Sequence, residues 1–227
     1  MTSVDRTRSV RLYLVRHGQT FGNTSGALDT GEPGLNLTPL GESQALAAAE
    51  ALRGANIGSV HVSTLVRTHQ TAAPFLRLTG LQSQVHASLR EIQAGDFEMR
   101  SDDPAVSGYI TTVASWILGD LEVRMPGAES GREFLERYDA ALVDAVGDRT
   151  SGSLLVVSHG AAIRTWVSCR VPGADQHPDA HGHLHNTACI VVEGHPDTGW
   201  ELIDWHADPL GGHDLEDPAA PDPTADA

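Results

Sequence analysis

Two apolar segments of this 227-residue sequence each end in a histidine followed by a glycine. They are "LYLVRHG", which ends at Gly18, and "LLVVSHG", which ends at Gly160. In open α/β sheets, ligands bind beyond the carboxyl ends of the strands. If the two segments are parallel neighbouring strands, His17 and His159 face each other at that edge. A single histidine at a strand end is more often a hydrogen-bonded structural residue, but two in matched contexts favour a functional site.

Two arginines accompany these histidines. Arg16 directly precedes His17, and Arg67 lies in "STLVRTHQTA", just after a predicted strand and at the start of a predicted helix. Arg67 taken alone would be interpreted as a solvated surface residue, but its place after a strand end favours the site. Guanidinium groups are suited to binding phosphoryl oxygens. Together with the two histidines, these arginines predict an anion pocket in a chain whose formal net charge is −15.

A glutamate is the candidate proton donor for such a pocket. Glu91 lies in "SLREIQAGDFE", ahead of a turn that contains glycine. Beside bound phosphate, a carboxyl group can protonate a leaving alcohol. We interpret the neighbouring Asp96 and Glu98 as acidic residues of a loop.

Alternating strand and helix patterns must position these side chains. Apolar runs predict strands over residues 9–15, 59–63, 153–160, 187–193 and 200–206. Helical patterns cover residues 38–53, 65–80, 130–146 and 161–170. This alternation predicts an α/β fold: a three-layer sandwich with a mostly parallel central sheet, helices on both faces and a short cap excursion.

Local signals support the predicted helix boundaries. Thr38 is a predicted N-cap with Pro39 at the first helical position. Ser130 and Glu133 have the spacing of a capping box. Pro74 is expected to kink or interrupt the helix over residues 65–80.

The composition divides the chain into a catalytic domain with a cap-like excursion and an acidic tail. We expect one catalytic domain over residues 1–207, with residues 92–125 forming the cap-like excursion around the weak helical pattern "GYITTVASWIL". Residues 208–227 hold six acidic residues, four prolines and no lysine or arginine. That composition predicts a disordered or loosely attached tail.

Composition excludes several classes of protein. A strongly acidic chain is a poor partner for nucleic acid or anionic membranes. No apolar run approaches the length of a membrane span, and the N-terminus has no apolar signal region. We therefore expect a cytoplasmic protein, in which Cys169 and Cys189 are reduced.

Six segments, in order from about Val10 to Val192, resemble motifs of the histidine phosphatase superfamily, in its phosphoglycerate mutase-like branch. They are "LVRHGQTFGN", "LNLTPLGESQA", "STLVRTHQTA", "LREIQAGDFE", "MPGAESGREFLER" and "VVSHGAAIR". One position departs from the family pattern, because Met99 follows Glu98 where the family often has glycine. This departure puts the shape of the loop in question rather than the catalysis.

The resemblance implies a reaction through a phosphohistidine, with no metal and no cofactor. His17 would be the nucleophile, and Glu91 would be the general acid that later becomes the general base. The phosphoryl oxygens would be held by the remaining site residues, which are Arg16, Asn23, Arg67, His159 and Gly160. A homodimer is a hypothesis that rests on the resemblance alone.

The charge of the cap favours a phosphatase over a mutase. A mutase must hold a second anionic group, yet Arg100 and Arg124 are the only basic residues among the many acids of residues 92–125. An acidic cap repels a highly charged bisphosphate. We therefore favour a phosphomonoesterase acting on a small phosphorylated metabolite, with phosphoglycerate mutase-type transfer as the alternative. Tyr109 and Trp116 either contact an apolar part of the substrate or are buried in the domain.

A hypothesis of another class is a metal-binding or non-catalytic protein. The stretch "HPDAHGHLHN" contains four histidines between His177 and His185, and dense histidine tracts can bind metal. The stretch lacks a regular zinc-ligand spacing, so we favour a polar loop. Retention of both a nucleophile, His17, and an acid, Glu91, argues against a degenerate family member.

Overall fold

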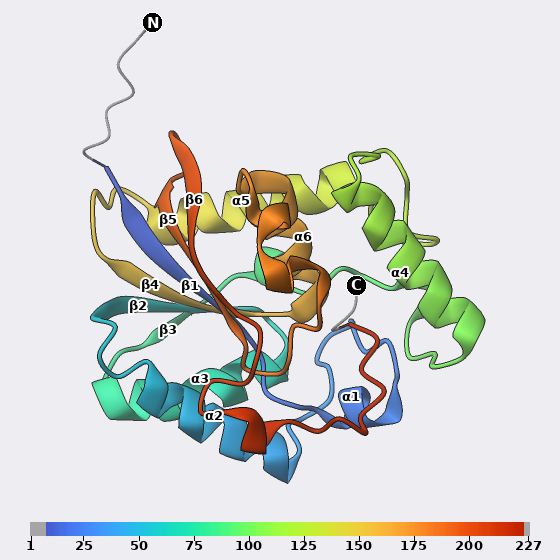
Figure 1. The fold of residues 1–227 in the computed structure, drawn as a ribbon, viewed down its shortest axis with the longest axis horizontal. Coiled ribbons are helices and arrows are strands. Elements are labelled where there is room, and N and C mark those ends of the chain that lie inside the picture. Colours follow the sequence, from blue (N-terminus) through green and yellow to red (C-terminus); the bar gives the residue numbers. More distant parts are fainter. Residues whose placement is uncertain (1–7, 225–227) are drawn as a thin grey trace, which may run out of the picture.

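The computed structural model describes residues 8–224, except for the side chain of His181. Its centre is a six-stranded sheet with the order β3-β2-β4-β1-β5-β6 (Figure 1). Strands β1 to β4 are mutually parallel where they pair, and β5 and β6 are antiparallel. The sheet is therefore mostly parallel, as predicted. The strands are β1 Val10–Arg16, β2 Ile57–Val62, β3 Ser83–Val85, β4 Ser153–Ser158, β5 Cys189–His195 and β6 Gly199–His206.

The register of β1 and β4 places the two His-Gly pairs side by side. Arg16 pairs with Ser158 in this parallel ladder, and each histidine is the residue that follows. Because both strands run in the same direction, His17 and His159 emerge at the same carboxyl edge. The expected pairing of the two apolar segments is confirmed.

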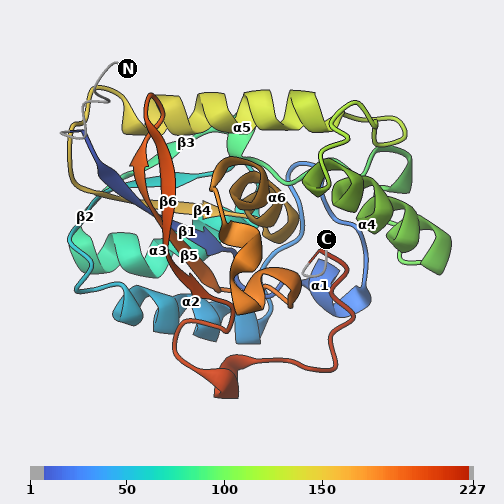
Figure 2. The same ribbon diagram turned by 45° about the horizontal axis from the view of Figure 1, so that its top comes forward.

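Helices cover both faces of the sheet. Figures 1 and 2 show α2 (Pro39–Ala51) and α3 (Val66–Thr79) on one face, and α5 (Gly131–Val146) and α6 (Gly160–Arg170) on the other. Side chains alternate along β1, so that Leu12 and Leu14 enter the core beneath α5 and α6 while Val15 enters the core beneath α2 and α3. This alternation explains why β1 reads as continuously apolar.

The predicted helix starts are confirmed, and Pro74 does not interrupt its helix. The Thr38 side chain accepts a hydrogen bond from the Gly41 backbone N–H, and Ser130 and Glu133 form a reciprocal capping box. Helix α3 continues through Pro74 to Thr79. The three-residue strand β3 and the short helix α1 (Phe21–Ser25) were not predicted from the sequence.

The cap consists mainly of α4 (Asp103–Ile117), which packs beside α6. Tyr109 and Trp116 are completely buried. The Tyr109 hydroxyl donates to the Ile92 carbonyl (3.2 Å), and the Trp116 indole donates to the Val123 carbonyl (2.8 Å). Of the two interpretations of these aromatic residues, the structure supports burial.

The acidic tail differs from the disordered segment that its composition suggested. Gln44 donates to the Leu215 carbonyl (2.8 Å), and Gln19 donates to the Asp217 carboxylate (2.8 Å). The chain then runs past α1 (Figure 2), where Asp222 and Thr224 are buried. Specific polar partners on the domain hold this segment despite its low apolar content. Residues 225–227 of the predicted tail lie outside the described residues.

Within the described part of the chain, no helix is both long and apolar enough to cross a membrane.

Candidate active site

His17 lies at the end of β1, and only 2% of it is exposed. Its Nδ1 lies 2.8 Å from the Gly18 carbonyl oxygen. Because a carbonyl can only accept, Nδ1 carries the proton and Nε2 keeps a free lone pair. Burial, with help from the charges of Arg67 and Arg16, holds the pKa of His17 well below its ordinary value. The imidazole is therefore neutral and nucleophilic at neutral pH.

Gly18 allows the chain to leave the strand against α2. A Cβ atom at this position would lie 2.7 Å from the Gly41 carbonyl oxygen. The Gly18 backbone N–H donates to the Thr71 hydroxyl (2.9 Å), which ties the turn to α3. The carbonyl that orients His17 is thus held by two helices on the same face of the sheet.

His159 faces His17, with ring centroids 5.2 Å apart in an edge-to-face arrangement. Its Nε2 contacts the Ser63 hydroxyl (2.8 Å), and its Nδ1 accepts from Arg67 Nε (3.3 Å). Nδ1 must therefore be unprotonated in this state. Burial is also the main cause that lowers the pKa of His159 well below its ordinary value. Ser63 ends the predicted strand 59–63, but no sequence signal marked it as a partner of His159.

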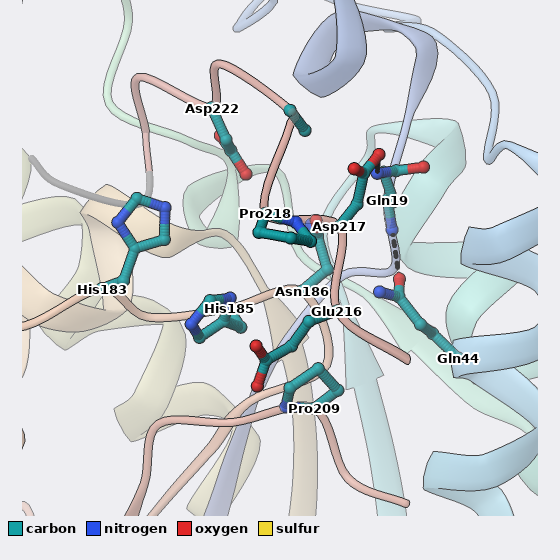
Figure 3. Close-up of a pocket in the computed structure, with 11 residues that line it drawn as sticks. Gln19, Gln44, His183, His185, Asn186, Pro209, Glu216, Asp217, Pro218 and Asp222 are labelled. Atoms are coloured by element: carbon teal, nitrogen blue, oxygen red, sulfur yellow. Dashed lines mark hydrogen bonds between the residues drawn. The ribbon is translucent and has the colours of Figure 1, made fainter. Parts of the chain in front are cut away.

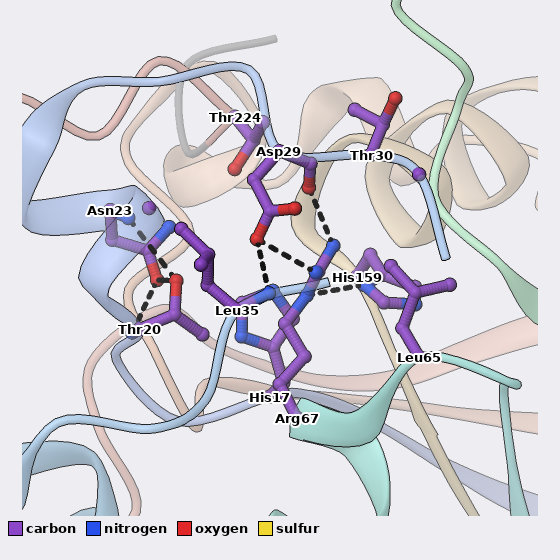
Figure 4. A network of polar contacts seen from close by, with 12 residues as sticks. His17, Thr20, Asn23, Asp29, Thr30, Leu35, Leu65, Arg67, His159 and Thr224 are labelled. Atoms are coloured by element: carbon purple, nitrogen blue, oxygen red, sulfur yellow. Dashed lines mark hydrogen bonds and ion pairs between the residues drawn. The ribbon is translucent and has the colours of Figure 1, made fainter. Parts of the chain in front are cut away.

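Arg67 is directed into the same site by Asp29 (Figure 4). Its Nη2 donates to the Asp29 carbonyl (2.9 Å), and its Nη1 lies 3.3 Å from the Asp29 carboxylate. The second position of α3 and these contacts fix the guanidinium beside both histidines. Asp29 lies in the Gly-rich stretch before Leu37, and sequence reasoning did not single it out.

Arg16 and Asn23 bind the same carboxylate, which comes from the tail. The Arg16 side chain is completely buried, and its Nη2 lies 2.5 Å from Asp222 Oδ2. Asn23 Nδ2 donates to Asp222 Oδ1 (3.0 Å). The structure thus brings Arg16 and Asn23 together, as predicted, and adds a partner from 206 residues further along the chain.

Glu91 is buried at the first turn of α6. Its Oε1 accepts from the backbone N–H groups of Ile92 (2.9 Å) and Ala162 (2.8 Å), and Oε2 accepts a longer bond from Ala161 (3.3 Å). Burial raises the pKa of Glu91, and this effect outweighs the backbone hydrogen bonds and the charge of Arg67. A carboxyl group with a raised pKa suits a proton donor.

A mostly buried ion pair supports the loop that carries Glu91. Arg137 on α5 pairs with Glu129 (2.6 Å) and donates to the Glu91 carbonyl (3.0 Å). Both residues lie in the "MPGAESGREFLER" motif. The motif therefore marked this segment in the sequence, but it did not reveal that the ion pair supports the Glu91 backbone.

The Glu98 side chain binds the loop that contains Asp29. Its carboxylate accepts from the backbone N–H groups of Thr30 and Gly31 (2.9 Å each) and from the Thr30 hydroxyl, which holds the loop that contains Asp29. Met99, next in sequence, has a positive φ of 59°, a conformation that favours glycine. The chain thus keeps the left-handed turn at the position where the family often has glycine.

Gly160 is the first residue of α6 and lies against Arg16. A Cβ at Gly160 would lie 2.9 Å from Arg16 Nε and 2.7 Å from the Thr224 carbonyl oxygen. Glycine is therefore needed for this close approach, while its role in phosphate binding stays a prediction.

The histidine-rich stretch does not form a metal site of its own in the described residues. His177 stacks on Trp205, with ring centroids 5.9 Å apart. His185 instead lies with Asp208 and Glu216 in a group that could hold a cation. Figure 3 shows two of its members, His185 and Glu216. His213 contacts both carboxylates, at 3.3 and 2.5 Å, so a protonated histidine can balance their charge.

Comparisons with known proteins agree with this arrangement. Residues 12–208 match the model of the histidine phosphatase superfamily, branch 1. The probable phosphoglycerate mutase GpmB of Salmonella paratyphi C is 29% identical over 204 residues, which cover 89% of this chain and 93% of the relative. The native structure of mycobacterial glucosyl-3-phosphoglycerate phosphatase has a TM-score of 0.70 at 25% identity, covering 88% of this chain and all of that chain.

A longer relative also matches. The PE-PGRS family protein PE_PGRS11 of Mycobacterium tuberculosis is 36% identical over 222 residues, which cover 90% of this chain. The chain spans only 38% of the length of that relative.

Fold and comparisons together define an α/β enzyme of the phosphatase class. The chain belongs to the histidine phosphatase superfamily, branch 1. This membership confirms the family resemblance of the six sequence motifs.

Proposed function

We propose that this protein is a metal-independent phosphomonoesterase that hydrolyses a small phosphorylated metabolite through a phosphohistidine at His17 Nε2. The observation that carries the proposal is the 2.8 Å contact between His17 Nδ1 and the Gly18 carbonyl. This contact requires the proton on Nδ1, and it supports Nε2 as the nucleophile inside a pocket with two buried arginines.

In the first step, His17 Nε2 attacks phosphorus and the bond to the substrate alcohol oxygen breaks. Arg16, Arg67 and Asn23 stabilise the phosphoryl oxygens, and His159 contributes when its contact with Arg67 rearranges. Glu91 gives its proton to the leaving alkoxide. Oε2 suits this transfer, because its bond to Ala161 is the longer one (3.3 Å).

In the second step, water attacks the phosphohistidine. Glu91, now ionised, removes the proton from water, and the phosphorus–nitrogen bond breaks to return neutral His17 and inorganic phosphate. Donors fixed before reaction lower the barrier without reorganisation. Arg137 and Glu129 support this step by holding the Glu91 backbone.

The arginines of the cap support hydrolysis over transfer between phosphoglycerates. Arg100 pairs with Asp102 (2.7 Å), and Arg124 pairs with Glu133 (2.8 Å). Both cations thus already have carboxylate partners on the surface. A second anionic group on a substrate would meet an acidic segment with no unpaired arginine among its described residues.

The test is a rapid-quench experiment with labelled p-nitrophenyl phosphate in the presence of a chelator. We expect an acid-labile phosphoenzyme that disappears in His17→Ala, with turnover unaffected by the chelator. Loss of turnover in the chelator would contradict metal independence. Phosphoglycerates form a second arm, and isomerisation that outpaces hydrolysis would support the mutase alternative instead.

A further inference from the structure

The end of the described tail occupies the place where the proposed mechanism needs the phosphoryl group. Asp222 presents one carboxylate oxygen to Arg16 (2.5 Å) and the other to Asn23 (3.0 Å). Thr224 adds a hydroxyl contact to Arg16 (3.1 Å). A carboxylate and a phosphoryl group both present paired, negatively charged oxygens to a guanidinium, so the two compete for these donors.

We propose that residues 218–224 are an intramolecular inhibitor, in which the Asp222 carboxylate occupies the phosphoryl subsite formed by Arg16 and Asn23. The proposal rests on the proposed function, because that function assigns these two residues to phosphate. The tail must withdraw before a phosphomonoester can bind.

The charge of Arg16 explains why an internal anion is needed. A completely buried guanidinium without an anionic partner is costly, because the charge has lost its hydration. Among the residues that the structure describes, Asp222 supplies the carboxylate for Arg16, and the Leu184 carbonyl accepts from Nη1 (2.6 Å). Phosphate can replace Asp222 without leaving the charge unpaired, so exchange between the two anions is feasible.

The space that remains around His17 is too small for substrate. Arg67, Asn23 and Thr224 line the cavity there, with a volume of about 10 Å³, near the lower limit of roughly 10–15 Å³ for a single water. A cavity of about 350 Å³ is lined by residues 220–223 and by residues of α1 and α4. Withdrawal of the tail would join the two spaces and give the leaving alcohol room beside the cap.

The tail is built as an anchor followed by a movable end. The Leu215 carbonyl accepts a hydrogen bond from Gln44, and the Asp217 carboxylate accepts one from Gln19. Figure 3 shows the Asp217 side chain beside Gln19. Three prolines then follow between residues 218 and 223, and they limit the conformations of this end. Anchoring keeps Asp222 at a high local concentration near Arg16. The apparent affinity for phosphate should therefore equal the affinity of the open site multiplied by the fraction of time that the site is open.

The test compares binding of inorganic phosphate, by calorimetry, in the full chain and in two variants. Asp222→Asn keeps the shape of the side chain and removes its charge, and a chain ending at Asp217 keeps the anchor and removes the inhibitor. We expect phosphate to bind about tenfold more tightly to both, as for a site that is about 90% closed. KM for p-nitrophenyl phosphate should fall equally, with kcat within about twofold.

Asp214→Asn is the matched control. It removes the same charge from the same tail at an exposed position, and we expect phosphate affinity to stay within about twofold of the full chain. A synthetic peptide of residues 218–227 added to the shortened chain should compete with phosphate. The Asp222→Asn form of that peptide should not compete.

The outcomes separate the two proposals. Unchanged or weaker phosphate binding in Asp222→Asn overturns the inhibitory role, even if the full chain hydrolyses phosphomonoesters through His17. Tighter binding without any phosphoenzyme supports the inhibitory role and contradicts the proposed function. If the shortened chain folds, by circular dichroism, and no form binds phosphate, both proposals fail. If the shortened chain does not fold, phosphate binding by Asp222→Asn alone decides whether residues 218–224 are inhibitory.

Discussion

The Glu91 carboxylate accepts a 2.8 Å hydrogen bond from the backbone N–H of Ala162. Ala162 lies in the first turn of α6, the helix that directly follows His159. The candidate acid and the second histidine are therefore positioned by one helix start. The N-terminus of a helix also stabilises negative charge, which suits a carboxyl group that is ionised in the proposed second step.

Replacement of Glu91 should separate substrates by their leaving groups. Glu91→Gln keeps the shape of the side chain but cannot supply the acidic proton, so we expect kcat/KM for an alkyl phosphate to fall by about 10²- to 10⁴-fold. p-Nitrophenyl phosphate should lose much less, because nitrophenolate leaves without a proton. Glu122→Gln, on the exposed cap surface, is the control. Equal losses for both substrates would argue against Glu91 as the acid.

The pH profile of kcat/KM for an alkyl phosphate should be set by Glu91 on its alkaline side. The active form of the acid is protonated, so activity should fall as the pH rises through the raised pKa of Glu91. That limb should be absent for p-nitrophenyl phosphate. On the acid side, the pKa of His17 lies well below 6.5, so activity should persist below pH 6.5. An acid limb centred at pH 6.5 would contradict the neutral, desolvated state of His17.

Gly18→Ala should reduce both stability and activity. The added Cβ would lie 2.7 Å from the Gly41 carbonyl oxygen, and such overpacking costs about 1–3 kcal/mol. Displacement of the turn also moves the carbonyl that orients His17, so kcat should fall. Gly54→Ala is the control, because no described atom lies within 4 Å of its Cβ. Urea unfolding and steady-state kinetics measure both effects, and equal behaviour of the two variants would refute the close-packing argument.

His61 should make the protein less stable in mild acid. It is buried in β2 between His86 (2.9 Å) and Ser59 (3.0 Å), and burial lowers its pKa to about 4. The unfolded chain binds a proton near pH 6.5 that the folded chain accepts only near pH 4. The free energy of unfolding should therefore fall as the pH drops through this window, by at most about 1.4 kcal/mol per pH unit.

Urea titrations at several pH values test the His61 prediction. His61→Asn should show a shallower dependence between pH 6.5 and 4, whereas His206→Asn, exposed at the end of β6, should keep the slope of the unmodified chain. An unchanged slope in His61→Asn would show that other groups cause the acid sensitivity.

Local sequence signals predicted most helices and strands, but they did not predict the shortest strand. Thr38 and Ser130 marked two helix starts correctly, because a cap is formed between residues three positions apart. Pro74 does not end α3, because the packing of α3 against α2 and the sheet tolerates a proline that costs the helix one hydrogen bond. Strand β3 has only three residues, too few for a period to be recognised.

The sequence by itself determined the family, the sheet edge and most of the candidate anion-binding residues, because those signals are contained in short, ordered motifs. Only the tertiary structure decided which carboxylates pair with the arginines among them. Asp29 meets Arg67 across 38 residues, and Asp222 meets Arg16 across 206. Such contacts have no local pattern, since they depend on how separate segments pack at one edge. The acidic tail shows this clearly, because its composition gives no sign that the Asp222 carboxylate lies beside the buried Arg16 at the carboxyl end of β1.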